Sequence, residues 1–170
     1  GHAGWRTYSV SGRVKRPGVK IAPNGLTILE LIDEFCGGME DGHELAAYLP
    51  GGASGGFLPA RLTPPLAFGA IEEHGGFIGS AAEVVFSRAD DLRAAALELA
   101  RFFAHESCGQ CTPCRVGTAK SVELLGRPVW DKALLGDLAS VMRDASICGL
   151  GQAAPNVWQS LLRHFPELLP

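Results

Sequence analysis

The sequence predicts an α+β protein in which a small β-grasp module is followed by a four-helix bundle. Two observations predict this fold class. Residues 1–88 contain short alternating segments of polar and apolar side chains separated by glycine and proline, which is typical of strands and turns. Residues 89–170 contain apolar side chains at helical spacing with short breaks between segments, which is typical of packed helices. We therefore expect two domains that meet near residues 88 and 89.

Two strands and a helix are expected first. Residues 7–14 alternate between apolar and polar side chains, and Arg16-Pro-Gly18 turns the chain into a second strand. Thr27 with Glu30 three residues later matches the capping box, so a helix should start directly after Thr27. The paired glycines at 37–38 should end that helix, because glycine accepts the left-handed backbone conformation of a helix end.

Two further strands are expected at residues 45–49 and 83–86, and the order strand, strand, helix, strand, strand is typical of a β-grasp module. Between them, residues 58–82 are rich in proline and glycine without periodicity, which predicts a linker running over the surface. Residues 50–56 are glycine-rich but lack the lysine of a P-loop. A tight turn close to neighbouring backbone is favoured there over a nucleotide site.

Four helices are expected in the second half. The first covers residues 89–105, with acidic side chains at its start, where the helix dipole favours them. The second should begin at Pro113 and end near Leu125, because proline suits the first turn of a helix. Asp131 has the position of a cap for the third helix, and Pro155 opens the fourth. Gly149 and Gly151, between these two helices, are expected to let the chain turn tightly.

Composition and charge exclude several classes of function. Of the 170 residues, 46% are hydrophobic and 19% are charged, which describes a globular chain able to form a core. The 15 Lys and Arg and 18 Asp and Glu are shared evenly by the two halves, so no basic face predicts nucleic acid. No apolar run reaches the roughly 18 residues of a membrane span, and no signal peptide is recognised. An odd number of cysteines in a metal-like pattern favours a reducing, cytoplasmic location.

Four of the five cysteines form one pattern. Cys108, Cys111 and Cys114 are spaced three apart, and Cys148 follows from a distant segment, so together they can surround one metal centre. Thiolate ligands without clustered histidine or carboxylate select zinc, copper(I) or an iron-sulfur cluster. Structural zinc usually takes two separate ligand pairs. The spacing therefore favours a 4Fe-4S cluster, while a structural zinc site and redox-active thiols stay open as alternatives.

Neighbouring residues support a cluster. Gly109 can take a positive φ between two ligands, and a helix starting near Pro113 would point unpaired N–H groups at the metal centre. Arg115 is placed to be a cation beside a negatively charged cluster, although a solvated helix arginine is equally expected.

Other reactive side chains are expected to have structural or solvated positions. Cys36 lies on the apolar helix of the first half, where a buried small hydrophobe is expected. His105 precedes the first ligand by three residues, and a packed or solvated ring is favoured over a contact with sulfur. Glu72, Glu73 and His74 could serve as acid–base groups, but we expect them to be solvated.

Two segments carry a resemblance to a known family: Glu106-Ser-Cys-Gly-Gln-Cys-Thr-Pro-Cys-Arg-Val-Gly117 and Ile147-Cys-Gly-Leu-Gly-Gln-Ala-Ala-Pro-Asn156. They closely resemble the NADH-binding flavoprotein (beta) subunit shared by respiratory complex I, NAD-reducing hydrogenases and NAD-dependent formate dehydrogenases. The resemblance implies that Cys108, Cys111, Cys114 and Cys148 hold a 4Fe-4S cluster that exchanges electrons with FMN. The second segment looks more like the hydrogenase and formate dehydrogenase branch than the complex I branch.

The first half resembles the soluble-ligand-binding β-grasp domain of the same family, on Ser11-Gly-Arg-Val-Lys-Arg-Pro-Gly18 and Pro50-Gly-Gly52. The family's flavin and NADH site lies in a large upstream domain, and its glycine-rich loop is not found in this sequence. The resemblance therefore implies that FMN and NAD bind in an adjoining domain and that no catalytic residue lies in this stretch. A chain that opens at Gly1 rather than Met is also expected of a fragment.

These observations lead to one expected function and two alternatives. We expect the electron-transfer part of an NAD-dependent oxidoreductase complex, with a 2Fe-2S or other iron-sulfur electron-carrier subunit and the flavin/NADH domain as partners. The first alternative is a structural zinc module for assembly without redox activity. The second is a ligand-binding or scaffolding β-grasp domain whose helical bundle holds no metal.

Overall fold

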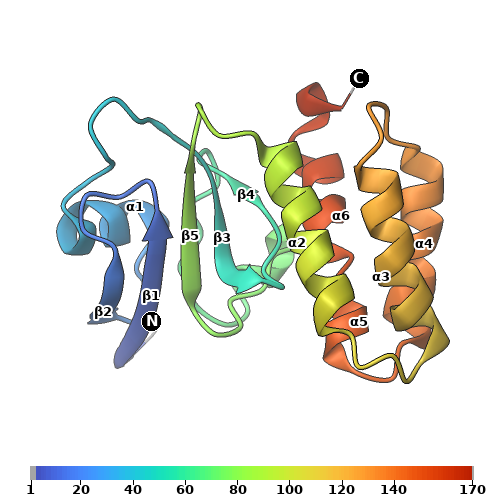
Figure 1. The fold of residues 1–170 in the computed structure, drawn as a ribbon. Coiled ribbons are helices and arrows are strands. Elements are labelled where there is room, and N and C mark those ends of the chain that lie inside the picture. The colour runs from blue at the N-terminus through green and yellow to red at the C-terminus, as the bar shows by residue number, and fades with distance from the viewer. Residues whose placement is uncertain (1–2, 170) are drawn as a thin grey trace. The chain divides into compact units, whose positions relative to one another are not determined.

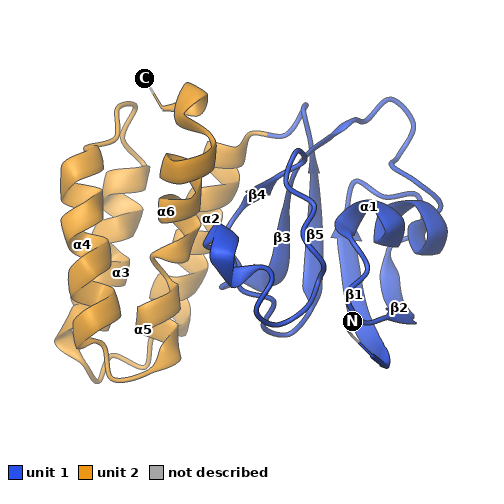
Figure 2. Cartoon of the chain, turned by 180° about the vertical axis from the view of Figure 1, so that it is seen from behind, with its two compact units in different colours: residues 1–90 blue, residues 91–170 orange. Residues whose placement is uncertain are grey.

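The computed structural model describes residues 3–169, so Gly1, His2 and Pro170 lie outside the described residues. The chain divides into two compact units, Gly1–Asp90 and Asp91–Pro170, coloured separately in Figure 2. The first unit holds a sheet and a short helix, and the second unit is helical.

The first unit is a five-stranded mixed sheet in the order β2-β1-β5-β3-β4. β1 pairs with β2 in antiparallel and with β5 in parallel orientation, and β3 pairs antiparallel with both β5 and β4. The parallel pair of first and last strands at the centre is the topology of a β-grasp module, which confirms the predicted fold class (Figure 1). The strands are β1 (Trp5–Gly12), β2 (Gly18–Pro23), β3 (Leu45–Ala53), β4 (Leu58–Pro59) and β5 (Ala82–Ser87). The sequence pattern did not predict β4, which is only two residues long.

The helix of the first unit starts as the capping box predicts. The side chain of Thr27 accepts a hydrogen bond from the Glu30 N–H, and the Glu30 carboxylate accepts one from the Thr27 N–H at 2.7 Å. A single α-helical turn, α1 (Ile28–Glu30), continues as a π-helical turn over Leu31–Phe35. Cys36 follows and is fully buried with the apolar face of this helix in the core, which confirms its prediction as a small hydrophobe.

Residues 58–82 are not the surface linker that their composition predicts. Leu66, Ile71 and Ile78 are fully buried and belong to the same core as the sheet and α1. The Leu66 N–H donates to the Leu26 carbonyl at 2.8 Å, which ties the segment to the start of the helix. Isolated apolar side chains on irregular backbone can fill a core without any periodicity, and for that reason the pattern did not reveal them.

The glycine-rich segment 50–56 lies against neighbouring backbone, as predicted, but its first residues continue β3 and the turn covers only residues 54–55. A Cβ atom on Gly51 would lie 2.1 Å from the Phe77 carbonyl oxygen, and one on Gly55 would lie 2.6 Å from the Gly51 nitrogen. Only residues without a side chain can approach so closely. The glycines are therefore explained by packing within the module.

One carboxylic acid lies inside the β-grasp core. Glu83, Val85 and Ser87 are the buried positions of β5, and Glu83 has no exposed surface. Among the described residues, neither carboxylate oxygen of Glu83 has a hydrogen-bond partner. Burial raises the pKa of Glu83 well above its ordinary value, and Arg6 opposes this shift. We therefore expect Glu83 to be a neutral acid in the folded protein.

The second unit is a bundle of four longer helices and one short helix. They are α2 (Leu92–Glu106), α3 (Thr112–Leu125), α4 (Lys132–Ala145), α5 (Gly149–Ala153) and α6 (Asn156–His164), and a 3-10 turn follows at Pro166–Leu168. The four longer helices confirm the predicted bundle, but Gly149 and Gly151 lie in α5 where the sequence suggested a tight turn. Among the described residues, no helix has both the length and the apolar character that a membrane span requires.

Aspartate caps and two tryptophans organise the bundle. The Asp91 carboxylate accepts from the Arg93 and Ala94 N–H groups, so α2 begins later than the expected residue 89. Asp131 accepts from the Leu134 N–H at 3.0 Å and caps α4, as predicted. The buried Trp158 on α6 donates its indole N–H to the Leu135 carbonyl of α4 at 3.0 Å, and Trp130 donates to the end of α3 in the same way.

Candidate metal centre

The four predicted ligands lie at one end of the bundle, on two connections between helices. Cys108 is in the loop between α2 and α3, Cys111 is the N-cap residue of α3, and Cys114 is in its first turn. Cys148 is the N-cap residue of α5, three residues after the end of α4. Figure 1 shows the α2–α3 loop and the connection from α4 to α5 at the same end of the bundle.

Hydrogen bonds hold the loop that carries the first three cysteines. Gly109 adopts a φ of +76°, which a residue with a side chain would adopt only with strain. Its N–H donates to the Ser107 hydroxyl at 3.3 Å, and the same hydroxyl lies 3.3 Å from the Cys114 sulfur. Its carbonyl accepts from the Arg115 guanidinium. Both backbone polar groups of Gly109 are therefore hydrogen-bonded to side chains that flank the cysteines.

The two cysteine segments lie close together at Cys111. The backbone amides of Ile147 and Cys114 lie near the sulfur of Cys111 and lower the pKa of its thiol. Thiolate, not thiol, is the form that binds metal. Since Ile147 immediately precedes Cys148, this proximity places the fourth cysteine near the loop of the other three.

α5 packs against the start of α3 at a glycine. A Cβ atom on Gly151 would lie 2.8 Å from the Cys114 Cβ and 2.4 Å from the Ser146 hydroxyl oxygen. No larger residue fits at this position without moving one of these groups. Gly151 therefore allows the close approach of the two ligand segments, a role that the predicted turn did not suggest.

The four thiols are not paired as disulfides, and they differ in exposure. Cys108 and Cys148 are exposed, Cys111 is partly buried, and Cys114 is buried. Among residues 3–169, no three His, Cys, Asp or Glu side chains lie close enough, as they stand, to hold a single metal ion. A zinc ion would require its sulfur ligands to converge on one point at about 2.3 Å. A cubane binds each cysteine through a different iron, so its ligands stand further apart.

The residues present fit a 4Fe-4S cluster. The donor set is four free thiols with no histidine or carboxylate among them, which matches the soft ligands that such clusters take. The backbone amides near Cys111 lower the pKa of its thiol, and they would also stabilise a negatively charged centre. In addition, the hydroxyl oxygen of Ser146 is buried beside Cys114 and has no hydrogen-bond partner within the described part of the chain.

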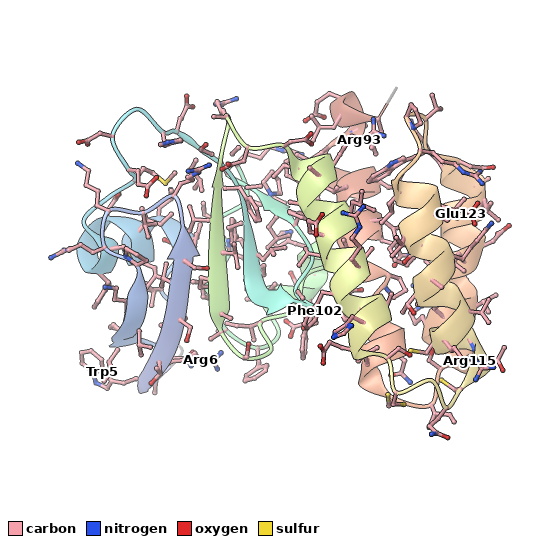
Figure 3. All side chains as sticks on the ribbon, in the orientation of Figure 1. Trp5, Arg6, Arg93, Phe102, Arg115 and Glu123 are labelled. Atoms are coloured by element: carbon pink, nitrogen blue, oxygen red, sulfur yellow. The ribbon has the colours of Figure 1, made fainter. Side chains whose placement is uncertain are left out.

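Arg115 lies over the ligand loop, as Figure 3 shows at the start of α3. Its guanidinium donates to the Gly109 carbonyl and, at 3.4 Å, to the Thr112 hydroxyl. This places a positive charge at the end of the bundle that carries the cysteines. Arg115 is exposed, as the alternative of a solvated helix arginine also predicts, and its place beside a cluster stays a prediction.

The other predicted candidates do not join this site. The side chain of His105 is 86% exposed and lies 3.9 Å from the Glu106 carboxylate, which confirms the solvated ring. Glu72 and Glu73 are exposed on a short 3-10 turn of the first unit. Sequence reasoning missed the serines at 107 and 146. Their signal in the sequence was position: Ser107 precedes Cys108 by one residue, and Ser146 precedes Cys148 by two.

The fold and the site define an iron-sulfur protein in which a β-grasp module precedes a helical cluster domain. Comparisons with known proteins agree with this class. Residues 94–169 match the family described as the NADH-ubiquinone oxidoreductase-F iron-sulfur binding region, and residues 7–58 match the SLBB domain family. The first match indicates that this chain binds a 4Fe-4S cluster.

The chain belongs to the family of the 51 kDa subunits of NADH-ubiquinone oxidoreductase. It is 34% identical to the mitochondrial NADH dehydrogenase [ubiquinone] flavoprotein 1 of Dictyostelium discoideum over 177 residues, covering 98% of this chain and 37% of that protein. It is 33% identical to the mitochondrial NADH-ubiquinone oxidoreductase 51 kDa subunit of Aspergillus niger, covering 98% of this chain and 36% of that protein. The chain thus spans a little over a third of the length of these curated relatives.

A solved structure shows the same fold. The crystal structure of an NAD+-reducing [NiFe]-hydrogenase in its H2-reduced state matches this chain with a TM-score of 0.85 and 34% sequence identity. The match covers 97% of this chain and 29% of the hydrogenase chain. The relatives are therefore parts of oxidoreductases, and the chain corresponds to a portion of one such polypeptide.

Proposed function

We propose that this chain is the electron-transfer part of an NAD-dependent oxidoreductase complex. In this proposal Cys108, Cys111, Cys114 and Cys148 each bind one iron of the 4Fe-4S cluster. The observation that carries it is the close packing of α5 on the start of α3, where a Cβ atom on Gly151 would lie 2.8 Å from the Cys114 Cβ. This packing places the segment of the fourth ligand beside the segment of the other three.

The cluster would relay electrons between an FMN site and further iron-sulfur centres. The protein supplies position and electrostatics, while the cluster supplies the electron-transfer chemistry. Two of the four proposed ligands are exposed, which supports a centre near enough to the surface to exchange electrons with another domain or subunit. FMN and NAD would bind in an adjoining domain, and the partner would be an iron-sulfur electron-carrier subunit. No residue of this chain is proposed to act on NAD.

The branch of the family is also a proposal. The segment Cys148-Gly-Leu-Gly-Gln152 and the Ala-Pro-Asn156 that follows it favour a formate dehydrogenase or an NAD-reducing hydrogenase. The structural match to an NAD+-reducing hydrogenase supports an oxidoreductase of this kind, while the curated relatives named above belong to NADH dehydrogenase and NADH-ubiquinone oxidoreductase. We place the complex in the cytoplasm, since four reduced thiols are required for the cluster.

Metal analysis and spectroscopy test the proposal. Chain purified without oxygen should contain about four iron and four sulfide, absorb as a brown protein and give an electron paramagnetic resonance (EPR) signal on reduction. Zinc at one per chain, with no iron and no EPR signal, would instead establish the structural zinc module. Protein free of both metals after anaerobic reconstitution would leave the scaffolding alternative and redox-active thiols.

A further inference from the structure

The hydroxyl group of Ser146 is buried without a partner. Ser146 is the C-cap residue of α4, and the whole residue is 6% exposed. Within residues 3–169 its hydroxyl oxygen forms no hydrogen bond. Buried hydroxyl groups are nearly always hydrogen-bonded, because removal from water without a new partner is unfavourable. This exception therefore requires an explanation.

The surroundings of Ser146 fix the position of that hydroxyl. The Ser146 N–H donates to the Met142 carbonyl at 3.1 Å, and the side-chain amide of Gln152 donates to the Ser146 carbonyl at 3.0 Å. The backbone is thus held from α4 on one side and from α5 on the other. A Cβ atom on Gly151 would lie 2.4 Å from the Ser146 hydroxyl oxygen and 2.8 Å from the Cys114 Cβ, so the hydroxyl is near Cys114.

A second serine shows what such a hydroxyl does at this site. Ser107, directly before Cys108, has its hydroxyl 3.3 Å from the Cys114 sulfur. Ser146 holds a similar place two residues before Cys148, but its hydroxyl has no sulfur partner among the described residues. The missing partner of the Ser146 hydroxyl is thus expected to be a hydrogen-bond acceptor that is present only when the cysteines hold their metal centre.

We propose that the Ser146 hydroxyl donates a hydrogen bond to a sulfur of the bound 4Fe-4S cluster. Ser146 is then a positioning residue that raises the reduction potential. The reduced cluster carries one more negative charge than the oxidised cluster, so a donor at its sulfur stabilises the reduced form more. This inference rests on the proposed function, since it requires the cluster to bind at these cysteines.

The test compares Ser146→Ala with Ser140→Ala in the reconstituted chain. Ser140 is the matched control because it lies on α4, is exposed, and donates its hydroxyl to the Gly136 carbonyl at 3.2 Å. EPR-monitored redox titration should give a more negative midpoint potential for Ser146→Ala only. At a fixed potential the ratio of reduced to oxidised cluster should fall about fivefold, the effect of one hydrogen bond. Equal midpoint potentials in wild type and Ser146→Ala would overturn the inference.

Stability of the cluster-free chain gives a second, independent readout. Without a cluster, Ser146→Ala should unfold at the same temperature as wild type or higher, because the hydroxyl has no partner to lose. A lower unfolding temperature would show a partner within the protein and would contradict the inference. Faster iron loss to a chelator in Ser146→Ala, but not in Ser140→Ala, would support it. If wild type itself binds no iron, it is the proposed function that fails.

Discussion

Gly151 of α5 packs against Cys114 in the first turn of α3, where a Cβ atom on Gly151 would lie 2.8 Å from the Cys114 Cβ. The two residues are far apart in the sequence, and their contact joins the start of α3 to α5. Because Cys148 is the N-cap residue of α5, the helical framework places the fourth cysteine near the other three. The proposed cluster would therefore bind where these two helices begin.

Gly151→Ala should weaken the site by separating the two ligand segments. The added methyl group would lie 2.4 Å from the Ser146 hydroxyl and 2.8 Å from the Cys114 Cβ, so α5 must move. We expect a loss of about 1–3 kcal/mol in the free energy of unfolding of the cluster-free chain, with reduced iron retention. Denaturant titration measures the first effect. Gly149→Ala is the matched control, since its added methyl group would contact nothing within 4 Å. Equal effects in both variants would contradict this account of the packing.

Arg115→Gln should lower the reduction potential of the cluster. The guanidinium lies over the ligand loop through its bond to the Gly109 carbonyl, and its charge favours the more negative reduced state. Redox titration followed by EPR gives the midpoint potential directly. Arg101→Gln removes an exposed charge on α2, where the partner is Glu98, and should leave the potential unchanged. No shift in Arg115→Gln would mean that the charge is fully screened by solvent.

Asp90→Asn should destabilise the first unit at neutral pH and have little effect at pH 2. Hydrogen bonds from the Arg13 guanidinium and the Ser87 N–H lower the pKa of Asp90 to about 2. A lowered pKa means that the stabilisation is complete above pH 4, near the ordinary pKa, and is lost as the pH falls towards 2. The expected loss in the variant at pH 7 is about 1–2 kcal/mol. Unfolding of both proteins across this pH range tests it, and a difference that does not depend on pH would be inconsistent with the ion pair.

Glu83→Gln should remove a pH dependence of stability that is opposite in sign to that of Asp90, because the stability that Glu83 supplies is lost as the pH rises. Because burial raises the pKa of Glu83, the unfolded chain loses this proton at a lower pH than the folded protein. Wild-type stability should therefore fall as the pH rises above about 4.5, and the neutral glutamine should not show this fall. Between pH 5 and pH 8, the free energy of unfolding of Glu83→Gln should therefore increase relative to that of wild type as the pH rises. Parallel curves would show that Glu83 is ionised in the core.

The sequence predicted the features that depend on local pattern. The capping box at Thr27 and the cap at Asp131 both form, whereas the cap at Asp91 was not predicted and α2 starts after the expected residue. The order of strands and helices was enough to derive the β-grasp sheet and the bundle. Alternation along β5 is also present, but it gives no reason to expect a carboxylic acid at its buried position 83.

The features that the sequence did not predict depend on contacts between distant segments. The buried residues of 58–82 have no periodicity, so their place in the core follows only from the packed structure. Gly151 is read locally as a turn residue, whereas its close approach to Cys114 exists only once α3 and α5 meet. The lack of a hydrogen-bond partner for the Ser146 hydroxyl among the described residues likewise follows only from the three-dimensional structure.

The iron content of Cys148→Ser, compared with Cys36→Ala, tests the central claim most directly. Cys36 is buried in the first unit, so its replacement should leave about four iron per chain. Cys148→Ser should keep its helical circular dichroism but lose the cluster or convert it to a form with fewer irons, because three thiolates cannot hold four irons in the same way. An unchanged iron content and EPR spectrum in Cys148→Ser would contradict a cluster held by these four cysteines.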